Sequence, residues 1–572
     1  MADAHDSNMI QSHRQPDEQS SLDEKKSDLV HTNTANFDSD GLAKLPSSSS
    51  AEIVATNVQL VDDNGETQRW PIPSSSPRDP LNYNKWRKLG IVISCCWFSI
   101  FSLALIGGLG PIMSTFYGLY HEQGPEKVTW LSTLPSVMVG LGNLIVLPLS
   151  MVFGRRPVAL CATVVLIAGC TGSAVAQTFE QHLATRIVQG LAAGISESLL
   201  PLMITEISFV HERSKIFAIY WASQNVFSSA LNLAGSYQVA SMGWRWFYWI
   251  YVIAAAVGFV IAFFFLTETA YDRPPQHKDG VWYVVDKYGV NHAMTAEQLQ
   301  AATREGRFRS LSEHGTADAE SGELSFVGAL KPWSGMQRPA LRIAGRTLGD
   351  VVLAMMCPSI MYMALLLTVV LGCSIALSLT YSMVLIAVYH WVPANAGLIA
   401  IGGMCGAFFG MFYAGPVGDR IVMAMAKRNG GVLRPGHYLV VSIVPGLISF
   451  ASLMLYAFTA AGEATWAGPV MAWFLNQFAF TSMLIIGSAF ATVAYPKNPG
   501  AALLFVVGAK NIISYGITQG TLPMVTMHSS KWAYSVLAGV TAAAFVAGIP
   551  FYFFGDRMDK WAMRQQQRFF KR

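Results

Sequence analysis

Long apolar runs alternate with short polar turns along most of this chain. Most of the runs reach about 20 residues, which is enough to cross a ~30 Å hydrocarbon core. Short connections between successive runs predict antiparallel neighbouring helices. The pattern predicts twelve membrane spans in two sets of six, at roughly 89–117, 128–150, 157–177, 183–208, 217–240, 244–267, 356–388, 395–417, 438–460, 467–493, 501–526 and 532–554.

Polar sequence precedes, divides and follows the two sets of spans, and it contains most of the charged residues. The fold class predicted is an all-α integral membrane protein of about twelve transmembrane helices in two six-helix bundles. We expect a short surface helix near Ala296–Arg309 in the polar middle part. The predicted divisions are a disordered cytoplasmic tail (1–85), an N-terminal six-helix bundle (86–267), a cytoplasmic central loop (268–350), a C-terminal six-helix bundle (351–555) and a basic cytoplasmic tail (556–572).

A basic turn follows the second span of each set, which indicates a duplicated six-span unit. The first is Phe153-Gly154-Arg155-Arg156-Pro157, and the second is Gly415-Pro416-Val417-Gly418-Asp419-Arg420. Duplicated units packed face to face are how many membrane transporters create a substrate site near mid-membrane.

Composition and charge support a membrane protein with a defined orientation. The 572 residues are 52% hydrophobic and 13% charged, against roughly 25% charged in soluble proteins. Lys and Arg gather in one set of loops, which predicts that these loops and both termini are cytoplasmic. We expect a multi-pass protein of the cell membrane, with an internal membrane such as the vacuole left open. The net charge of +4 does not indicate a nucleic-acid partner.

The cysteines and histidines of the chain do not suggest a cofactor or metal site. The seven cysteines lie in apolar runs without a CxxC pair, and the simplest interpretation is apolar packing. The twelve histidines lie in tails, loops or span ends, and no GxxxxGK[ST] loop occurs. We therefore expect no cofactor, no metal and no enzymatic activity, since no nucleophile–base set is visible either. Energy for transport would then come from a gradient.

Span four carries the clearest intramembrane charges. Arg186, Gly190, Gly194 and Glu197 recur on one helix face. A charge at mid-bilayer costs at least ~2.5–3.5 kcal/mol on insertion scales, so such residues are functional candidates. Glu197 either lines the cavity or carries protons; the alternative is a structural salt bridge to Arg186 or to a neighbouring helix. The glycines allow a neighbouring helix to approach closely.

Polar residues in three further spans extend the candidate site. For the amides of span five, cavity lining and interhelical packing are both open. Lys510 either extends toward the cytoplasm, binds an anionic substrate, or pairs with Glu197 across the two halves. These additional candidates are Asn225 and Asn232 in span five, Asn476 and Gln477 in span ten, and Lys510 and Asn511 in span eleven.

Several stretches resemble the major facilitator superfamily, and within it the fungal branch of drug:proton antiporter type. The resemblance covers most of residues 79–560 and implies the major facilitator fold. In the family, the span-four motif is linked to proton coupling. The matching stretches are Asp79–Lys88, with Tyr83 where Trp is usual, Phe153–Pro157, Arg186–Gly190 followed by Gly194, His211–Arg213, Gly243–Phe247 and Leu266–Thr269.

The chain also departs from the family's patterns. The first loop usually reads Gly-x-x-x-Asp-Arg before Gly-Arg-Arg, but Leu147 replaces the glycine and Met151-Val152 replace Asp-Arg. The second half keeps the pair as Asp419-Arg420, and span five lacks the Gly-Pro pair of antiporters. We expect Gly154, Arg155, Arg156, Asp419 and Arg420 to serve gating; for the two first-loop arginines, positive-inside anchoring is the alternative.

These observations predict a secondary transporter that moves a small organic solute by alternating access. The first choice is proton-coupled efflux of a secondary metabolite or toxic compound by a monomer in the lipid bilayer. The alternative is uptake or exchange of a polyamine or organic acid, since Glu197 suits a cation and Lys510 an anion. A receptor or scaffold with a transporter fold is the non-transport alternative.

Overall fold

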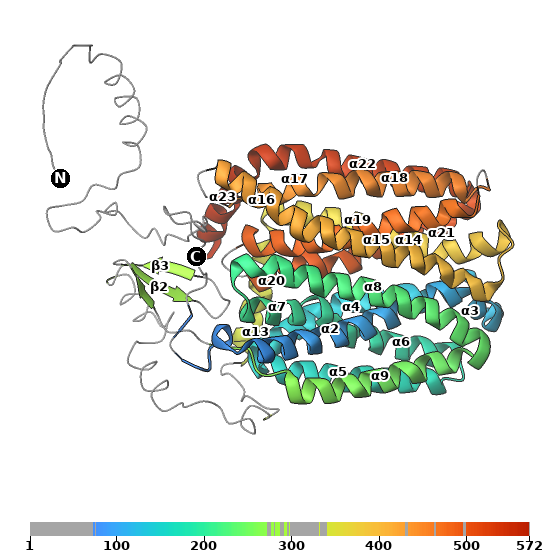
Figure 1. Ribbon diagram of the computed structural model, residues 1–572, viewed down its shortest axis with the longest axis horizontal. Coiled ribbons are helices and arrows are strands. Elements are labelled where there is room, and N and C mark those ends of the chain that lie inside the picture. Colours follow the sequence, from blue (N-terminus) through green and yellow to red (C-terminus); the bar gives the residue numbers. More distant parts are fainter. Residues whose placement is uncertain are drawn as a thin grey trace, which may run out of the picture.

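The computed structural model is a bundle of long helices that run nearly parallel to one axis, with a small sheet beyond one end (Figure 1). It describes residues 73–74, 76–271, 276–278, 281–285, 291–294, 297, 331, 340–429, 433–462, 465–495 and 499–570. We call the end of the bundle that carries Lys85, Arg155 and Arg428 the basic end.

The first half of the bundle follows the chain from Lys85 to Phe265. Its helices pack as one group, drawn from blue to green in Figure 1. The elements are η1 (Pro80–Asn82), α2 (Lys85–Gly107), η2 (Gly110–Ile112), α3 (Met113–Leu119), η3 (His121–Gln123), α4 (Pro125–Phe153), α5 (Arg155–Val175), α6 (Phe179–Ala193), η4 (Gly194–Glu197), α7 (Leu199–Ile207), α8 (Val210–Met242) and α9 (Trp244–Phe265).

The second half repeats the arrangement beside the first and is drawn from yellow to red in Figure 1. Its elements are α14 (Pro358–Ala387), η5 (Pro393–Leu398), α15 (Ile399–Phe412), η6 (Tyr413–Val417), α16 (Gly418–Arg428), α17 (Gly436–Val441), α18 (Ile443–Thr459), α19 (Ala467–Ala494), α20 (Pro499–Leu503), η7 (Leu504–Gly508), α21 (Ala509–Met527), α22 (Ser530–Val546) and α23 (Gly548–Phe570).

The helices confirm the predicted all-α membrane fold. Eleven segments of the described chain are long and apolar enough to cross a membrane. α8 packs among them against α2, α15 and α19 as the twelfth helix of the bundle. It is 33 residues long, but its polar residues make it less apolar than the others. The observed segments agree with the predicted spans to within a few residues, except that the segment Asn395–Arg428 runs past its predicted end at 417.

That exception corrects the interpretation of the second basic motif as a turn. Residues 415–420 are helical: the π-helical η6 contains Pro416 and continues directly into α16. Proline lacks an N–H and cannot complete the regular hydrogen-bond ladder, so the wider η6 accommodates it without ending the helix. The first motif is a turn, because Gly154 has a φ of 99° between α4 and α5. Residues other than glycine rarely adopt such a backbone conformation.

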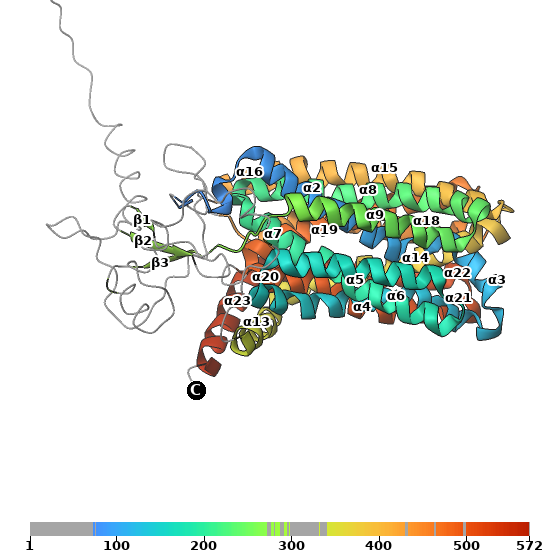
Figure 2. The same ribbon diagram turned by 90° about the horizontal axis from the view of Figure 1, so that it is seen from below.

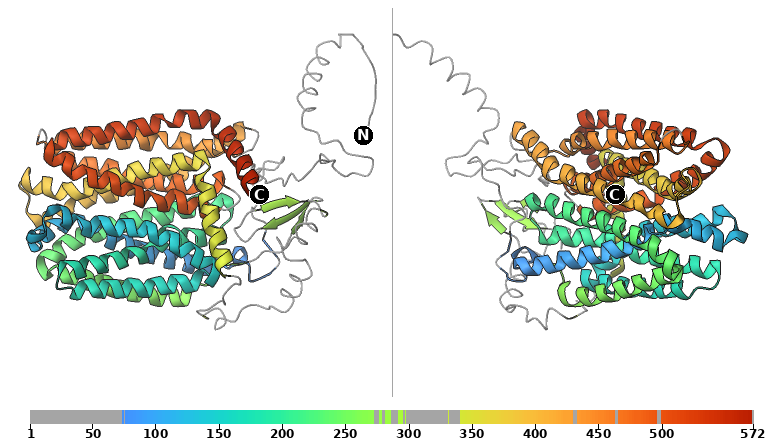
Figure 3. Two further views of the ribbon diagram at one scale, coloured as in Figure 1. Left: turned by 180° about the vertical axis from the view of Figure 1, so that it is seen from behind. Right: turned by 45° about the vertical axis from the view of Figure 1, so that its right-hand side comes forward.

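The segment between the halves contains a helix and a small sheet. α13 (Ala340–Met355) contacts α4 of the first half and α20 of the second at the basic end, where Figure 3 shows it lying across the bundle. β1 (Gln276–Lys278), β2 (Val281–Val285) and β3 (Asn291–Met294) form an antiparallel sheet in that order. The sheet lies beyond the membrane helices (Figure 2). The expected surface helix near Ala296–Arg309 falls outside the described residues, apart from residue 297.

The two halves pack closely along their shared interface. α4 packs on η7 and α21, and a Cβ on Gly508 of η7 would lie 3.2 Å from the amide of Asn143. α8 packs on α15, and Trp221 of α8 donates its indole N–H to Ser488 Oγ of α19 at 2.9 Å. At the end opposite the basic end, Ser382 donates to the Pro111 carbonyl at 3.5 Å. The halves thus meet along their length and at the end opposite the basic end, and we call this the closed arrangement.

Candidate functional site

Glu197 lies inside the bundle at a break in span four. The span begins as α6, passes through the 3₁₀ turn η4 and continues as α7. The break coincides with a close approach to α4, because a Cβ on Gly194 would lie 2.8 Å from the backbone nitrogen of Asn143. Only a glycine fits without movement of the backbone there. Glu197 is therefore positioned by a local helix distortion, and its side chain is buried.

Lys510 and Asn511 hold the Glu197 carboxylate from the opposite half. Both lie at the start of α21, directly after the π-helical η7. The Lys510 ammonium donates to Glu197 Oε1, and the Asn511 amide donates to Oε2. Lys510 Nζ also lies 3.4 Å from Asn511 Oδ1. The three residues form a buried, electrically balanced cluster, which we call the central charge cluster.

The sequence left three alternatives for Lys510, and in the structure Lys510 pairs with Glu197. Among the alternatives for Glu197, the partner is on a neighbouring helix and is not Arg186. A buried ion pair is costly to break, because removing one partner leaves an uncompensated charge and costs roughly 3–5 kcal/mol. The central charge cluster therefore joins the two halves strongly only while both charges are present.

Asn143 is a site residue that was not predicted from the sequence. It lies on α4 and is fully buried, and neither its Oδ1 nor its Nδ2 has a hydrogen-bond partner among the described residues. It lies between Gly194 and Gly508, the glycines that flank the central charge cluster. Its signal in the sequence was that it is the one side-chain amide of the helix 125–153. A buried amide without a hydrogen-bond partner lowers the free energy of unfolding by about 1–3 kcal/mol, so such a residue is a candidate for a functional role.

Arg186 does not contact Glu197 in the structure, although the sequence pattern places both on one helix face. Its guanidinium is fully buried and donates to the carbonyls of Leu131, Leu105 and Ile106 at 2.9–3.0 Å. It also donates to Gln189 Oε1 at 2.9 Å. These bonds tie α6 to α4 and to the end of α2. None of these acceptors in the described chain is a carboxylate, and proton coupling through Arg186 stays a prediction.

The other predicted amides lie on α8 and α19, two helices that are in contact with each other across the two halves. Asn225 donates to the Trp221 carbonyl of its own helix at 2.9 Å, while Oδ1 of the half-buried Asn232 has no partner in the described chain. Asn476 is fully buried with neither amide atom hydrogen-bonded there, and Gln477 Oε1 also lacks a partner. α8 and α19 therefore carry unused hydrogen-bonding capacity among the described residues, but these amides are not part of the central charge cluster.

The first-loop arginines bind carboxylates of their own half. Arg155 contacts Glu206 Oε1 through Nε at 3.1 Å and Nη2 at 2.9 Å. The backbone N–H groups of Arg155 and Arg156 donate to the two oxygens of Glu268 at 3.0 and 3.3 Å. Both arginines also donate to carbonyls at helix ends, Arg155 to Ser150 and Arg156 to Phe263. These contacts brace the first half, and Arg156 also donates to the Lys331 carbonyl of the central segment at 3.1 Å. Gating by these residues stays a prediction.

The segment before α2 continues this braced region. Tyr83 donates its hydroxyl to the Glu268 carbonyl at 3.2 Å, and the Arg87 guanidinium lies 3.9 Å above its ring. Burial raises the pKa of the Tyr83 hydroxyl, although the charge of Arg87 opposes that shift.

In the second half, Arg420 is exposed and Asp419 is half-buried at the start of α16. The two duplicated motifs therefore have different environments.

Two similar six-helix halves that enclose a buried charged cluster define a polytopic membrane protein of the transporter class. The chain belongs to the Major Facilitator Superfamily, whose family model matches residues 92–519. It is thus a multi-pass transporter of a small-molecule substrate, and its expected resemblance to this superfamily is confirmed.

Similar proteins agree with this assignment at low identity. A protein described as an uncharacterised MFS-type transporter of Schizosaccharomyces pombe is 23% identical, covering 91% of this chain and 92% of its own. The efflux pump vrtL of Penicillium aethiopicum is 21% identical, covering 85% and 90%. The solved structure of the proton:xylose symporter XylE is similar with a TM-score of 0.54 at 13% identity, covering 82% and 97%. That structural likeness shows the fold alone.

Proposed function

We propose that this protein is a secondary active transporter that exports a small organic solute, a secondary metabolite or toxic compound, by alternating access. The observation that carries the proposal is the pairing of Glu197 with Lys510 and Asn511 from the opposite half. Relatives with names such as efflux pump vrtL support the direction of transport. The two bundles would rock about the central charge cluster, as in transporters built from repeats.

The central charge cluster provides a physical reason for coupling. Both charges are satisfied in the closed arrangement, and the site carries no net charge. Protonation of Glu197, or its capture by a cationic solute, would leave Lys510 buried without compensation, and the closed arrangement would lose stability. A solute or proton shifts such an equilibrium only by its different affinity for the two arrangements. Glu197 is thus our candidate for proton coupling.

Polar groups around the cluster would bind the solute once the halves separate. Asn143 and Asn476 are fully buried amides without hydrogen-bond partners in the described chain. A solute with hydrogen-bonding groups would satisfy them and regain the free energy of burial. We assign Asn225, Asn232 and Gln477 to the same pathway, because they lie on the helices α8 and α19 at the interface.

Orientation and gating complete the proposal. The basic end would face the cytoplasm of the cell membrane, with both chain termini on that side, and the predicted domain divisions would hold. Gly154, Arg155 and Arg156 would keep the first half rigid, while Asp419 and Arg420 would form the movable gate beside α8. Gly415 supports this role, since a Cβ there would lie 3.1 Å from Ala218 of α8. We propose a monomer as the working unit.

Transport in proteoliposomes with an imposed pH gradient tests the proposal. Cationic, anionic and neutral organic solutes are each offered in both directions to the wild type and to Glu197→Gln. We expect the wild type to move at least one solute class against its gradient, and Glu197→Gln to lose pH-driven accumulation while keeping solute exchange. No movement of any solute under any gradient would overturn the transporter proposal, and intact pH-driven accumulation in Glu197→Gln would overturn the proton role.

Uptake or exchange of a polyamine or an organic acid is the second candidate. The paired charges favour it, because Glu197 would bind a cation and Lys510 an anion after separation. The same vesicles distinguish the candidates by direction: inward accumulation of a polyamine or organic acid would support uptake.

A further inference from the structure

Glu197 and Lys510 compensate each other's charge, and each belongs to a different half. Their side chains are 7% and 1% exposed, and in the described chain neither has a second ion-pair partner. Arg186, the other buried charge of span four, binds three backbone carbonyls and the Gln189 side chain within the first half. Separation of the halves therefore leaves an uncompensated negative charge on the first half and a positive charge on the second.

Each half also has one side-chain amide at this place. Asn511 follows Lys510 on α21 and donates to Glu197 Oε2 in the closed arrangement. Asn143 of the first half is fully buried, and neither of its amide atoms has a hydrogen-bond partner among the described residues. Its side chain faces the second half, because a Cβ on Gly508 would lie 3.2 Å from Asn143 Nδ2. After separation, each half would offer one charge and one amide to a solute.

The charge balance of the central charge cluster selects among classes of solute. A cation would compensate Glu197 and leave Lys510 without an opposite charge, and an anion would do the reverse. A neutral solute would compensate neither residue. Such an uncompensated charge is costly inside a protein, because no opposite charge replaces its lost hydration. A solute with one positive and one negative group replaces both members of the pair at once, and the site keeps zero net charge.

The tight packing around the cluster favours a solute whose opposite charges are close together. In the closed arrangement, the Lys510 ammonium and the Glu197 carboxylate are in direct contact. The neighbouring part of the interface is also tightly packed, since a Cβ on Gly140 of α4 would lie 2.6 Å from Ile512 of α21. A compact pair of opposite charges requires only a small separation of the halves, whereas distant charges require a larger one.

We propose that the transported solute is a small zwitterion of the α-amino acid type, in which an ammonium and a carboxylate are close together. This inference rests on the proposed function and names the substrate class of its central site. Glu197 binds the ammonium, with Asn143 Oδ1 as a second acceptor. Lys510 binds the carboxylate, with the side-chain N–H groups of Asn511 as further donors. Charge-assisted hydrogen bonds of this kind are roughly twice as strong as bonds between neutral groups.

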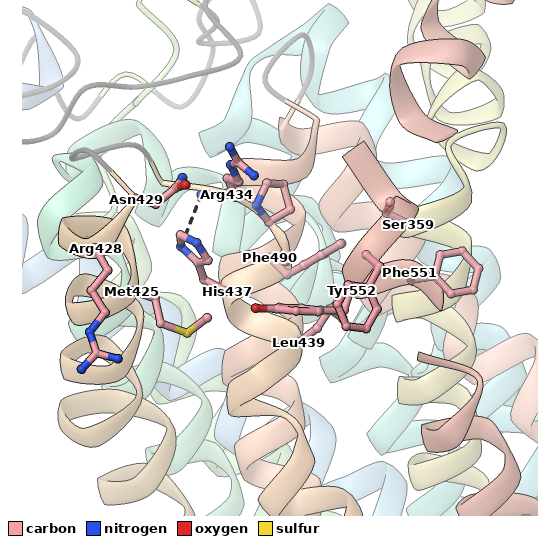
Figure 4. A pocket seen from close by; sticks show the side chains of 14 residues that line it. Ser359, Met425, Arg428, Asn429, Arg434, His437, Leu439, Phe490, Phe551 and Tyr552 are labelled. Atoms are coloured by element: carbon pink, nitrogen blue, oxygen red, sulfur yellow. Dashed lines mark hydrogen bonds between the residues drawn. The ribbon is translucent and has the colours of Figure 1, made fainter. Parts of the chain in front are cut away.

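The pocket shown in Figure 4 lies away from the interface between the halves. Its described lining residues, among them His437, Phe490 and Tyr552, all belong to the second half, and none of them belongs to the central charge cluster. Movement of one half against the other would not alternately open and close a pocket within a single half. The central charge cluster draws its charges from opposite halves, which is the position that alternating access requires.

Binding of matched solutes to the purified full chain tests the substrate class. A panel of α-amino acids is compared with the corresponding N-acetyl derivatives, which are anions, and amides, which are cations. Thermal-shift titrations in detergent measure affinity, and proteoliposomes measure transport of the same solutes. We expect at least one amino acid to bind the wild type about tenfold or more tightly than both of its derivatives, because each derivative leaves one charge of the site uncompensated.

Substitution of either charge should reverse this preference. We expect Glu197→Gln to bind the N-acetyl derivative more tightly than the amino acid, because only the positive charge of Lys510 remains. Lys510→Gln should prefer the amide for the opposite reason, and the double variant should prefer neither derivative. The controls Glu126→Gln and Lys427→Gln remove exposed charges of the same signs and should keep the preference of the wild type.

The wild-type series decides the inference even where a variant fails to fold. If no amino acid binds more tightly than its derivatives, the zwitterion is rejected, and transport of a cation or an anion would still support the transporter proposal. Transport of no solute under any gradient would overturn both proposals. If a preference for amino acids persists in Glu197→Gln and Lys510→Gln, the central charge cluster is not the binding site for the zwitterion.

Discussion

The ammonium group of Lys510 and the carboxylate of Glu197 form an ion pair between the two halves, although the two residues are 313 positions apart in the sequence. Asn511 completes the pair's hydrogen bonding from the residue next to Lys510. The closed arrangement of this transporter thus has a charged contact where its halves meet. The contact and the residues around it can be tested by substitution.

Breaking the pair on one side should destabilise the protein more than removing both charges. We expect Lys510→Met alone to lose about 3–5 kcal/mol, because Glu197 is left buried and charged. The double variant Glu197→Gln with Lys510→Met should recover part of this loss. Thermal unfolding in detergent, analysed as a double-mutant cycle, measures the coupling. If the losses of unfolding free energy in the two single variants simply add in the double variant, the ion pair does not contribute to stability.

Asn143 should matter for transport and not for stability. Asn143→Ala removes a buried amide that has no hydrogen-bond partner among the described residues, so we expect an unfolding temperature equal to or above that of the wild type. Apparent solute affinity should fall about threefold to tenfold, the value of one lost hydrogen bond. The control is Ser150→Ala on the same helix, whose hydroxyl bonds the Leu147 carbonyl at 2.7 Å. A stability loss with unchanged solute affinity would make Asn143 a packing residue.

The two duplicated motifs should respond differently to loss of an arginine. Arg155→Ala leaves the half-buried Glu206 without its guanidinium, and we expect about 1.5–3 kcal/mol of destabilisation, typical of hydrogen bonds to charged groups. Arg420→Ala removes an exposed cation and should change stability by less than about 0.5 kcal/mol. Thermal unfolding of both variants provides the comparison. Equal losses would mean that the motifs are structurally equivalent.

Gly194 should not tolerate a methyl group. A Cβ there would lie 2.8–2.9 Å from backbone atoms of Gly142 and Asn143, so α4 and η4 would have to separate. We expect Gly194→Ala to cost about 1–3 kcal/mol through overpacking, and to weaken transport by displacing Glu197. Gly516→Ala is the control, because no atom of the described residues lies within 4 Å of a Cβ at that position and alanine favours the helix. A stable and active Gly194→Ala would contradict the close approach.

The sequence indicated much of this architecture and part of the site. Runs of about 20 apolar residues leave little choice but membrane helices, since backbone groups must be satisfied inside each span. The low tolerance of the bilayer for charge also identified Glu197 and Lys510 individually. Their pairing was one of several alternatives, because spacing within one helix carries no information about the register of a helix in the other half.

Other features depended on contacts that no local pattern contains. Asn143 became a site residue through its position between Gly194 and Gly508 of two different spans. The motif before Asp419 contains glycine and proline, which are typical of a turn, but the π-helical η6 continues into α16. The strands β1–β3 were missed in a segment interpreted as polar loop, although the run Val281–Val285 has the β-branched and aromatic residues that favour a strand.

By itself, the sequence determined the membrane helices, the duplication and the charged residues inside the spans, whose insertion in a bilayer is costly. The tertiary structure decided which of these residues meet: Glu197 with Lys510 and Asn511, and Arg155 with Glu206. The physical reason is that hydrophobicity acts locally along the chain, while ion pairs and cavities arise from the packing of helices that are distant in sequence.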